Sequence, residues 1–148
     1  MAFRFPLEAV FHFRQSVEHQ EELRLRAANQ HLARARHLLE HVDQRIAEMR
    51  TRQSQQLTEG TTAAELRFAL LCDAALHDER REIERQILRL EALRDKQQTI
   101  YRRARRERET FESLRNRQLA EYRRGQARRE QRQLDDLFLL RQAYQRHS

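Results

Sequence analysis

The feature that most constrains this chain is a run of apolar and small side chains spaced alternately three and four residues apart. A repeat that averages 3.5 residues places a narrow apolar stripe along an α-helix, and a second helix must cover that stripe. The repeat therefore predicts a left-handed coiled coil. Its members are Leu25, Ala28, Leu32, Ala35, Leu39, Val42, Ile46 and Met49.

Upstream of this run the apolar spacing changes to a stutter, which locally relaxes the supercoil. The helix is predicted to begin at Pro6, because proline favours the first helical position, where its missing N–H costs nothing. The positions that carry the stutter are Val10, Phe13, Val17, Glu21 and Leu25.

A single cluster of helix-breaking residues lies at 58–65. Gly60 suits the left-handed residue that ends a helix, and Thr62 with Glu65 matches a capping box. With 2 glycines and 1 proline in 148 residues, there are too few turn residues for a many-stranded fold. The chain is predicted to be all-α, a long two-helix antiparallel coiled-coil hairpin that reverses once.

The hairpin is expected to form a single coiled-coil domain over residues 1–148, with helix one at about 6–57, a turn at about 58–62 and helix two at about 62–145. Because helix two is longer, about thirty C-terminal residues overhang the end of helix one. The stripe of helix two is predicted to shift phase after Leu90. Its positions are Leu66, Ala69, Leu70, Leu76, Ile83, Ile87 and Leu90, then Leu93, Gln97, Ile100, Ala104, Glu107, Phe111 and Leu114.

The net charge of +7 resides in one segment, residues 101–132, which holds 12 arginines and 5 glutamates. Such a basic block suits a nucleic acid, an anionic membrane or an acidic protein surface. Beyond it, apolar side chains with no helix-one partner are expected to dock on another protein. These are Leu134, Leu137, Phe138, Leu140 and Tyr144.

No catalytic, cofactor-binding or metal site is expected. Gly60 and Gly125 are too far apart for a phosphate-binding loop. His37 and His41 share one helix face but lack a third ligand, and Cys72 is the only cysteine, so a reducing compartment fits. The longest uncharged apolar run, residues 68–72, is much shorter than a membrane span, and the chain is expected in the cytoplasm.

The segment from Leu66 to Glu79 is apolar on two faces. One face can serve the coiled-coil seam, and the other is predicted to bind a partner, with tip packing, self-association or a shifted seam as alternatives. The second face consists of Phe68, Leu71, Cys72 and Ala75.

Each end of the chain carries a short recognisable pattern. Residues 3–14, Phe-Arg-Phe-Pro-Leu-Glu-Ala-Val-Phe-His-Phe-Arg, follow the pattern FxFxLxxVLxxR, with Phe11 in place of leucine. Residues 129–136, Arg-Glu-Gln-Arg-Gln-Leu-Asp-Asp, follow a run that ends in Leu-Asp-Glu, with Asp136 in place of glutamate. In these patterns, and over its whole length, the chain resembles the FliJ family of flagellar export proteins.

This resemblance implies a non-enzymatic stalk of the bacterial flagellar type III export apparatus, cytoplasmic and peripherally associated with the inner-membrane apparatus. Its implied partners are the hexameric export ATPase, the cytoplasmic domain of the membrane export gate and the export chaperones, with no small-molecule substrate. The gate is expected to meet Phe68, Leu71, Cys72 and Ala75. The ATPase is expected to meet Phe3, Phe5, Leu7, Phe11, Arg123, Arg124, Arg128, Arg129, Leu134 and Asp135.

Two alternatives remain open from the sequence. The chain could be the equivalent stalk of a virulence injectisome, against which the aromatic N-terminal pattern argues. It could also be a basic coiled coil that binds nucleic acid, although the stacking aromatics and recognition helix typical of such proteins are not visible.

Overall fold

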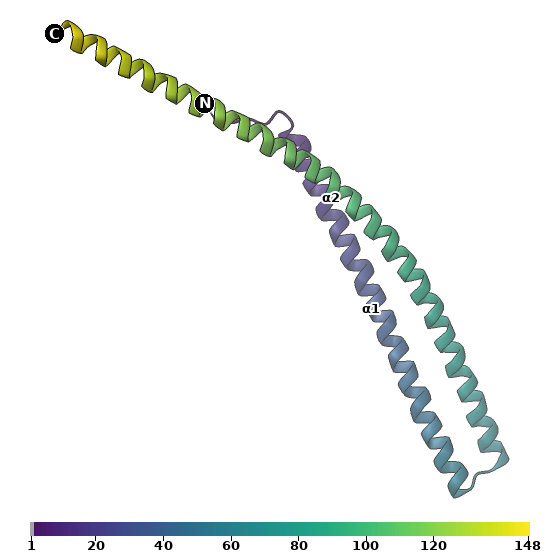
Figure 1. Ribbon diagram of the computed structural model, residues 1–148. Coiled ribbons are helices and arrows are strands. Elements are labelled where there is room, and N and C mark those ends of the chain that lie inside the picture. The colour runs from purple at the N-terminus through teal and green to yellow at the C-terminus, as the bar shows by residue number, and fades with distance from the viewer. Residues whose placement is uncertain (1) are drawn as a thin grey trace. The chain divides into compact units, whose positions relative to one another are not determined.

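The computed structural model describes residues 2–148 and is an all-α helical hairpin, as predicted. Helix α1 spans Glu8–Glu59 and helix α2 spans Ala63–His147. Figure 1 shows the short connection that joins them. No strand occurs within residues 2–148. Helix α1 begins after Pro6. Residues 6 and 7 form a turn, in which the Glu8 backbone N–H donates to the Phe5 carbonyl over 3.1 Å.

The turn has the backbone chemistry that the sequence predicts. Gly60 follows the last residue of α1 and adopts a φ of 96°, in the left-handed region. The Glu65 backbone N–H donates to Thr62 Oγ1 over 3.2 Å, and the Thr62 backbone N–H donates to Glu65 Oε2 over 3.4 Å. This reciprocal pair is a capping box, and it satisfies amide groups at the start of α2.

The two glycines are expected to respond oppositely to alanine substitution. Gly60→Ala should lower the free energy of unfolding by about 1 kcal/mol, because alanine is strained at positive φ. Gly125→Ala should raise helix stability by up to about 1 kcal/mol, because Gly125 lies inside α2 and an added Cβ meets no atom within 4 Å. Urea unfolding followed by circular dichroism measures both changes, and a loss of stability in Gly125→Ala would contradict this assignment.

The residues group into two compact units, which are described separately. The turn unit is His19–Arg102, and the terminal unit combines Met1–Glu18 with Arg103–Ser148. In the turn unit α1 and α2 lie side by side and antiparallel, as Figure 1 shows. Its core contains Val42, Ile46, Leu76 and Ile83.

The predicted seam of helix α1 is confirmed between residues 23 and 50. Its eight positions are buried or half-buried, whereas every other position in that range is exposed. Leu32 and Val42 are the most completely buried, each 2% exposed. The 3.5-residue repeat was a strong signal here because all its members are apolar or small.

The predicted stutter before Leu25 is wrong. Val10 and Phe13 are 37% and 61% exposed. The three-and-four spacing instead continues backward from Leu25 without a change of phase, through polar side chains that are half-buried. Its positions are Phe11, Arg14, Glu18 and Glu21, of which Glu21 is one of the predicted positions, and the predicted Val17 is also half-buried.

The predicted phase shift in helix α2 is also wrong. Leu70 and Leu93 are each 59% exposed, and Leu66 and Ile100 are 41% and 40% exposed. Arginines occupy seam positions instead, because their aliphatic stems cover apolar surface while their charged ends reach outward. The continuous seam includes Ala69, Leu76, Arg80, Ile83, Ile87, Leu90, Arg94, Gln97, Tyr101, Ala104, Arg108, Phe111, Arg115, Gln118 and Tyr122.

Candidate partner-binding surfaces

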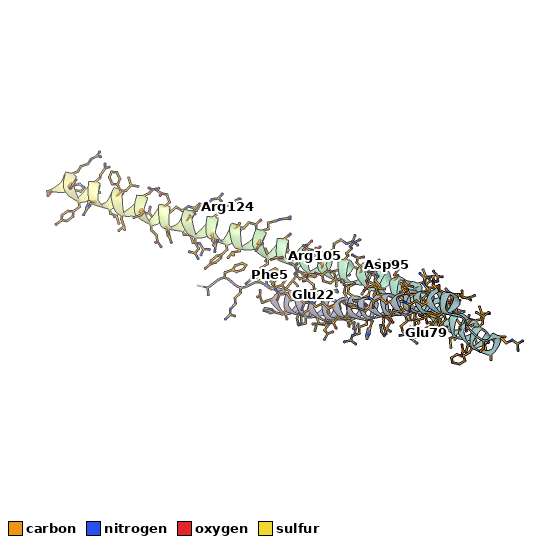
Figure 2. All side chains as sticks on the ribbon, turned by 90° about the horizontal axis from the view of Figure 1, so that it is seen from below. Phe5, Glu22, Glu79, Asp95, Arg105 and Arg124 are labelled. Carbon is orange, nitrogen blue, oxygen red and sulfur yellow. The ribbon has the colours of Figure 1, made fainter. Side chains whose placement is uncertain are left out.

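In the terminal unit, the aromatic N-terminal residues pack against α2. Phe5 and Phe11 are 6% and 5% exposed, and Phe3 is half-buried with its ring centroid 5.6 Å from that of Tyr122. Figure 2 labels Phe5 on the segment that precedes α1. Two of the predicted ATPase contacts, Phe5 and Phe11, are therefore core residues, whereas Leu7 is 38% exposed.

Ion pairs join the first residues of α1 to α2 within this unit. Arg14 Nη1 donates to Glu107 Oε2 over 2.6 Å, while the buried Arg14 Nε has no partner in residues 2–148. Arg115 Nε donates to Glu8 Oε2 over 3.1 Å, and the Arg115 guanidinium carbon lies 5.7 Å from the centroid of the Phe11 ring. Charged pairs thus continue the seam where apolar pairs stop.

Arg108 is the most connected of these arginines. Its Nε and Nη2 donate to the two carboxylate oxygens of Glu18 over 2.6 and 3.1 Å, and its Nη1 donates to Glu112. The side chains of Arg108 and Glu18 are only 19% and 17% exposed. The hydrogen bond that Arg108 donates to Glu18 raises the pKa of Arg108 above its ordinary value, against the lowering effect of burial. The guanidinium therefore stays charged. The forked hydrogen bonds between Arg108 and Glu18 suit an ion pair that stabilises the fold.

Arg108→Ala is expected to lower the stability of the terminal unit by about 2 kcal/mol, because it leaves the Glu18 carboxylate largely buried without its donor. Arg103→Ala is the matched control, because Arg103 is 80% exposed in its pair with Glu107 and should change stability by less than about 0.5 kcal/mol. Amide exchange of the terminal unit compares the two variants. Equal protection factors in both would show that the Glu18 pair contributes nothing.

The basic block of the sequence divides into two parts with different surroundings. In the first part Arg105 pairs with Glu109, and Arg103, Arg108 and Arg115 are paired as described above. In the second part, residues 116–132, six arginines accompany only two glutamates. Among the described residues no ion pair engages the exposed Arg123, Arg124, Arg128 and Arg129.

Within the described residues of the terminal unit, no second helix lies beside the end of α2. Figure 1 shows this stretch alone, and Figure 2 labels Arg124 on it. Every residue from 127 to 148 is exposed. The exposed apolar side chains are Leu134, Leu137, Phe138, Leu139, Leu140 and Tyr144, each more than 60% exposed. Unpaired arginines followed by uncovered apolar residues define the C-terminal surface, residues 123–144.

The predicted apolar face near the turn is only partly uncovered. Phe68 and Leu71 are each 70% exposed, and Ala75 is exposed. Cys72, placed on the same face by sequence, is half-buried beside α1. It lines a groove of about 420 Å³ between the helices, together with Met49, Gln53, Phe68, Ala69 and Leu76.

No group of three metal-ligating side chains occurs within residues 2–148. His37 is 85% exposed and contacts only Glu40 in an ion pair over 3.7 Å, while His41 is exposed. Both histidines lie off the seam, as their spacing predicted. Within the same residues, no helix is both long and apolar enough to cross a membrane.

A helical hairpin with uncovered charged and apolar surfaces defines the class of elongated all-α proteins that offer surfaces for protein interaction. Comparison with protein families agrees, since the sequence model described as "Flagellar FliJ protein" matches residues 3–148. The chain belongs to the FliJ family and is a component of the flagellar export apparatus. No curated protein and no solved structure matches it.

Proposed function

We propose that this protein is a non-enzymatic stalk that connects the hexameric export ATPase to the membrane export gate of the flagellar type III apparatus. The observation that carries the proposal is the C-terminal surface, where α2 exposes both unpaired arginines and apolar side chains. Guanidinium groups form forked hydrogen bonds with carboxylates, and uncovered leucines gain free energy when a partner buries them. Such a surface suits a protein partner with acidic side chains around an apolar centre.

On the ATPase side, the proposed contacts are the exposed arginines and their neighbours. Leu7 and Phe3 contribute from the N-terminal segment, whereas Phe5 and Phe11 act by holding that segment on α2. The Asp135 carboxylate accepts a hydrogen bond from Gln131 over 2.9 Å and remains exposed. The C-terminal contacts are Arg123, Arg124, Arg128, Arg129, Leu134 and Asp135.

On the gate side, Phe68 and Leu71 form the exposed part of the proposed contact with the gate's cytoplasmic domain, and Ala75 and Cys72 lie beside them. The protein also assists the export chaperones and works in the cytoplasm, peripherally attached to the inner-membrane apparatus. It needs no cofactor and no small-molecule substrate, because its role is to position proteins.

The direct test is the rate of ATP hydrolysis by the export ATPase with and without this chain, after the two proteins are co-purified. A stimulated rate and a stable complex support the proposal. Failure to form any complex at physiological salt would contradict it. Binding to a DNA or RNA duplex that falls steeply with salt would instead favour a nucleic-acid-binding role.

A further inference from the structure

The two flanks of the seam differ in the turn unit. Along one flank ion pairs join the helices, with Arg36 donating to Glu91 over 3.3 Å and Arg80 donating to Asp43 over 2.6 Å. On the opposite flank the Arg45–Glu79 pair, at 3.3 Å, lies toward the turn. Farther from the turn, the α1 residues on that flank are His31, Arg34 and Leu38, and none of them forms an ion pair with α2 within the described residues.

A groove of about 490 Å³ occupies this unbridged flank. Leu38 on α1 and Leu93 on α2 stand at its sides and are 52% and 59% exposed. Ala35 and Leu90, both seam residues, line it between these leucines. Ile100, one heptad beyond Leu93, is 40% exposed and extends the apolar surface along α2. The groove is therefore an apolar channel between two parallel rows of side chains, the shape into which a third helix packs.

The charges around the groove select its occupant. Its polar lining consists of His31, Arg34, Gln86 and Arg89, with no aspartate or glutamate. Arg89 shares Glu82 with Arg85, while Arg34 is exposed and has no ion pair among residues 2–148. A second copy of this chain docked symmetrically, groove against groove, would bring the same cations against these, which is unfavourable. An acidic partner gains both apolar burial and charge pairing.

We infer that this groove binds an amphipathic helix of another protein, with a leucine-type apolar stripe flanked by aspartate or glutamate. The apolar stripe contacts Leu38 and Leu93, and the acidic flanks pair with Arg34 and Arg89. The inference rests on the turn unit alone and does not depend on the proposed ATPase or gate contacts. It gives the hairpin a third attachment surface, distinct from the Phe68 face and the C-terminal surface.

The probe is a fluorescent synthetic peptide of about three heptads, with leucine at the a and d positions and glutamate at the flanking positions. Anisotropy titration with the full chain should show saturable binding. Leu38→Ala with Leu93→Ala, and separately Arg34→Glu with Arg89→Glu, should each weaken binding at least tenfold. Arg36→Glu with Arg50→Glu makes the same charge change on the ion-paired flank and should leave affinity within twofold, with helicity checked by circular dichroism.

Four results would overturn the inference. The first is equal affinity for a peptide in which lysine replaces every glutamate, since charge selection would then be absent. The second is absence of binding, and the third is an equal loss of affinity in the Arg36/Arg50 variant. The fourth is a sedimentation equilibrium result in which the chain dimerises and Leu38→Ala with Leu93→Ala abolishes the dimer, because the occupant would then be a second copy.

Discussion

Replacing Phe11 with alanine is expected to lower the stability of the terminal unit by about 3 kcal/mol. The ring is 5% exposed and lies beneath the Arg115 guanidinium, so truncation leaves a cavity at the junction of α1 and α2. Amide exchange of residues 8–18, measured under native conditions, reports this loss as faster opening of the first turns of α1. Urea unfolding gives a second measure of the same change.

Phe13→Ala is the matched control. It removes the same side chain two residues away, where the ring is 61% exposed, and should change stability by less than about 0.5 kcal/mol. Equal effects of the two substitutions would show that the aromatic N-terminal residues do not form the core of the terminal unit. An unchanged exchange rate in Phe11→Ala would carry the same meaning.

A third variant, Phe11→Leu, separates a packing role of the aromatic N-terminal pattern from a contact role. The resemblance to the family implies that Phe5 and Phe11 lie at the ATPase-binding end, and their burial gives them a packing role there. If packing is their whole contribution, a Phe11→Leu variant that retains apolar volume should keep ATPase binding near that of the parent chain.

The sequence predicted the turn and the central seam because both depend on local chemistry. Gly60 and the Thr62–Glu65 pair act within a few residues of one another, and their geometry follows from backbone rules. The seam between Leu25 and Met49 is carried by apolar side chains alone, so periodicity identifies it without knowledge of the partner helix.

The polar part of the seam could not be predicted from apolar spacing. Glu18 and Arg14 occupy seam positions whose side chains are charged, and their partners Arg108 and Glu107 lie about ninety residues away in sequence. These partners neutralise the charges that Arg14 and Glu18 bring into the half-buried seam. Extending the three-and-four spacing backward from Leu25 regardless of polarity would have found these positions, because Phe11 restores an apolar residue in the same phase.

The errors in helix α2 have a related cause. Leu93 and Ile100 are apolar, yet a pair of helices has only one shared seam, and Arg94 and Tyr101 occupy it instead. Sequence alone treats a leucine as a stronger seam residue than an arginine. Leu93 and Ile100, which lie outside the seam, form part of the uncovered apolar surface on the unbridged flank. The positions that were wrongly assigned to the seam therefore coincide with a candidate interface.

Charge counting predicts one basic block at residues 101–132, and the structure divides this block into two parts. Arg103 to Arg115 face carboxylates of α1 and of their own helix, whereas Arg123 to Arg129 extend past those carboxylates. Charge counting along the sequence cannot make this distinction, because the neutralising residues Glu8 and Glu18 belong to the other end of the chain.

Reversing the charge of Arg123, Arg124, Arg128 and Arg129 to glutamate is expected to abolish stimulation of the export ATPase, with at least a tenfold loss of affinity. The four side chains are exposed and have no ion pair within residues 2–148, so their removal costs the fold little. Helical content measured by circular dichroism should therefore match that of the parent chain. ATP hydrolysis by the ATPase, titrated with each protein, measures the functional loss.

A second variant tests whether position or total charge matters. Reversing the exposed arginines Arg26, Arg50, Arg52 and Arg67 makes the same change in net charge within the turn unit and should leave ATPase stimulation within twofold. If both variants lose stimulation equally, the ATPase responds to the overall charge of the chain. If neither variant loses stimulation, the C-terminal surface does not engage the ATPase. That result does not bear on the inferred role of the groove beside Leu38 and Leu93, because the groove lies in the turn unit and is tested with a synthetic peptide.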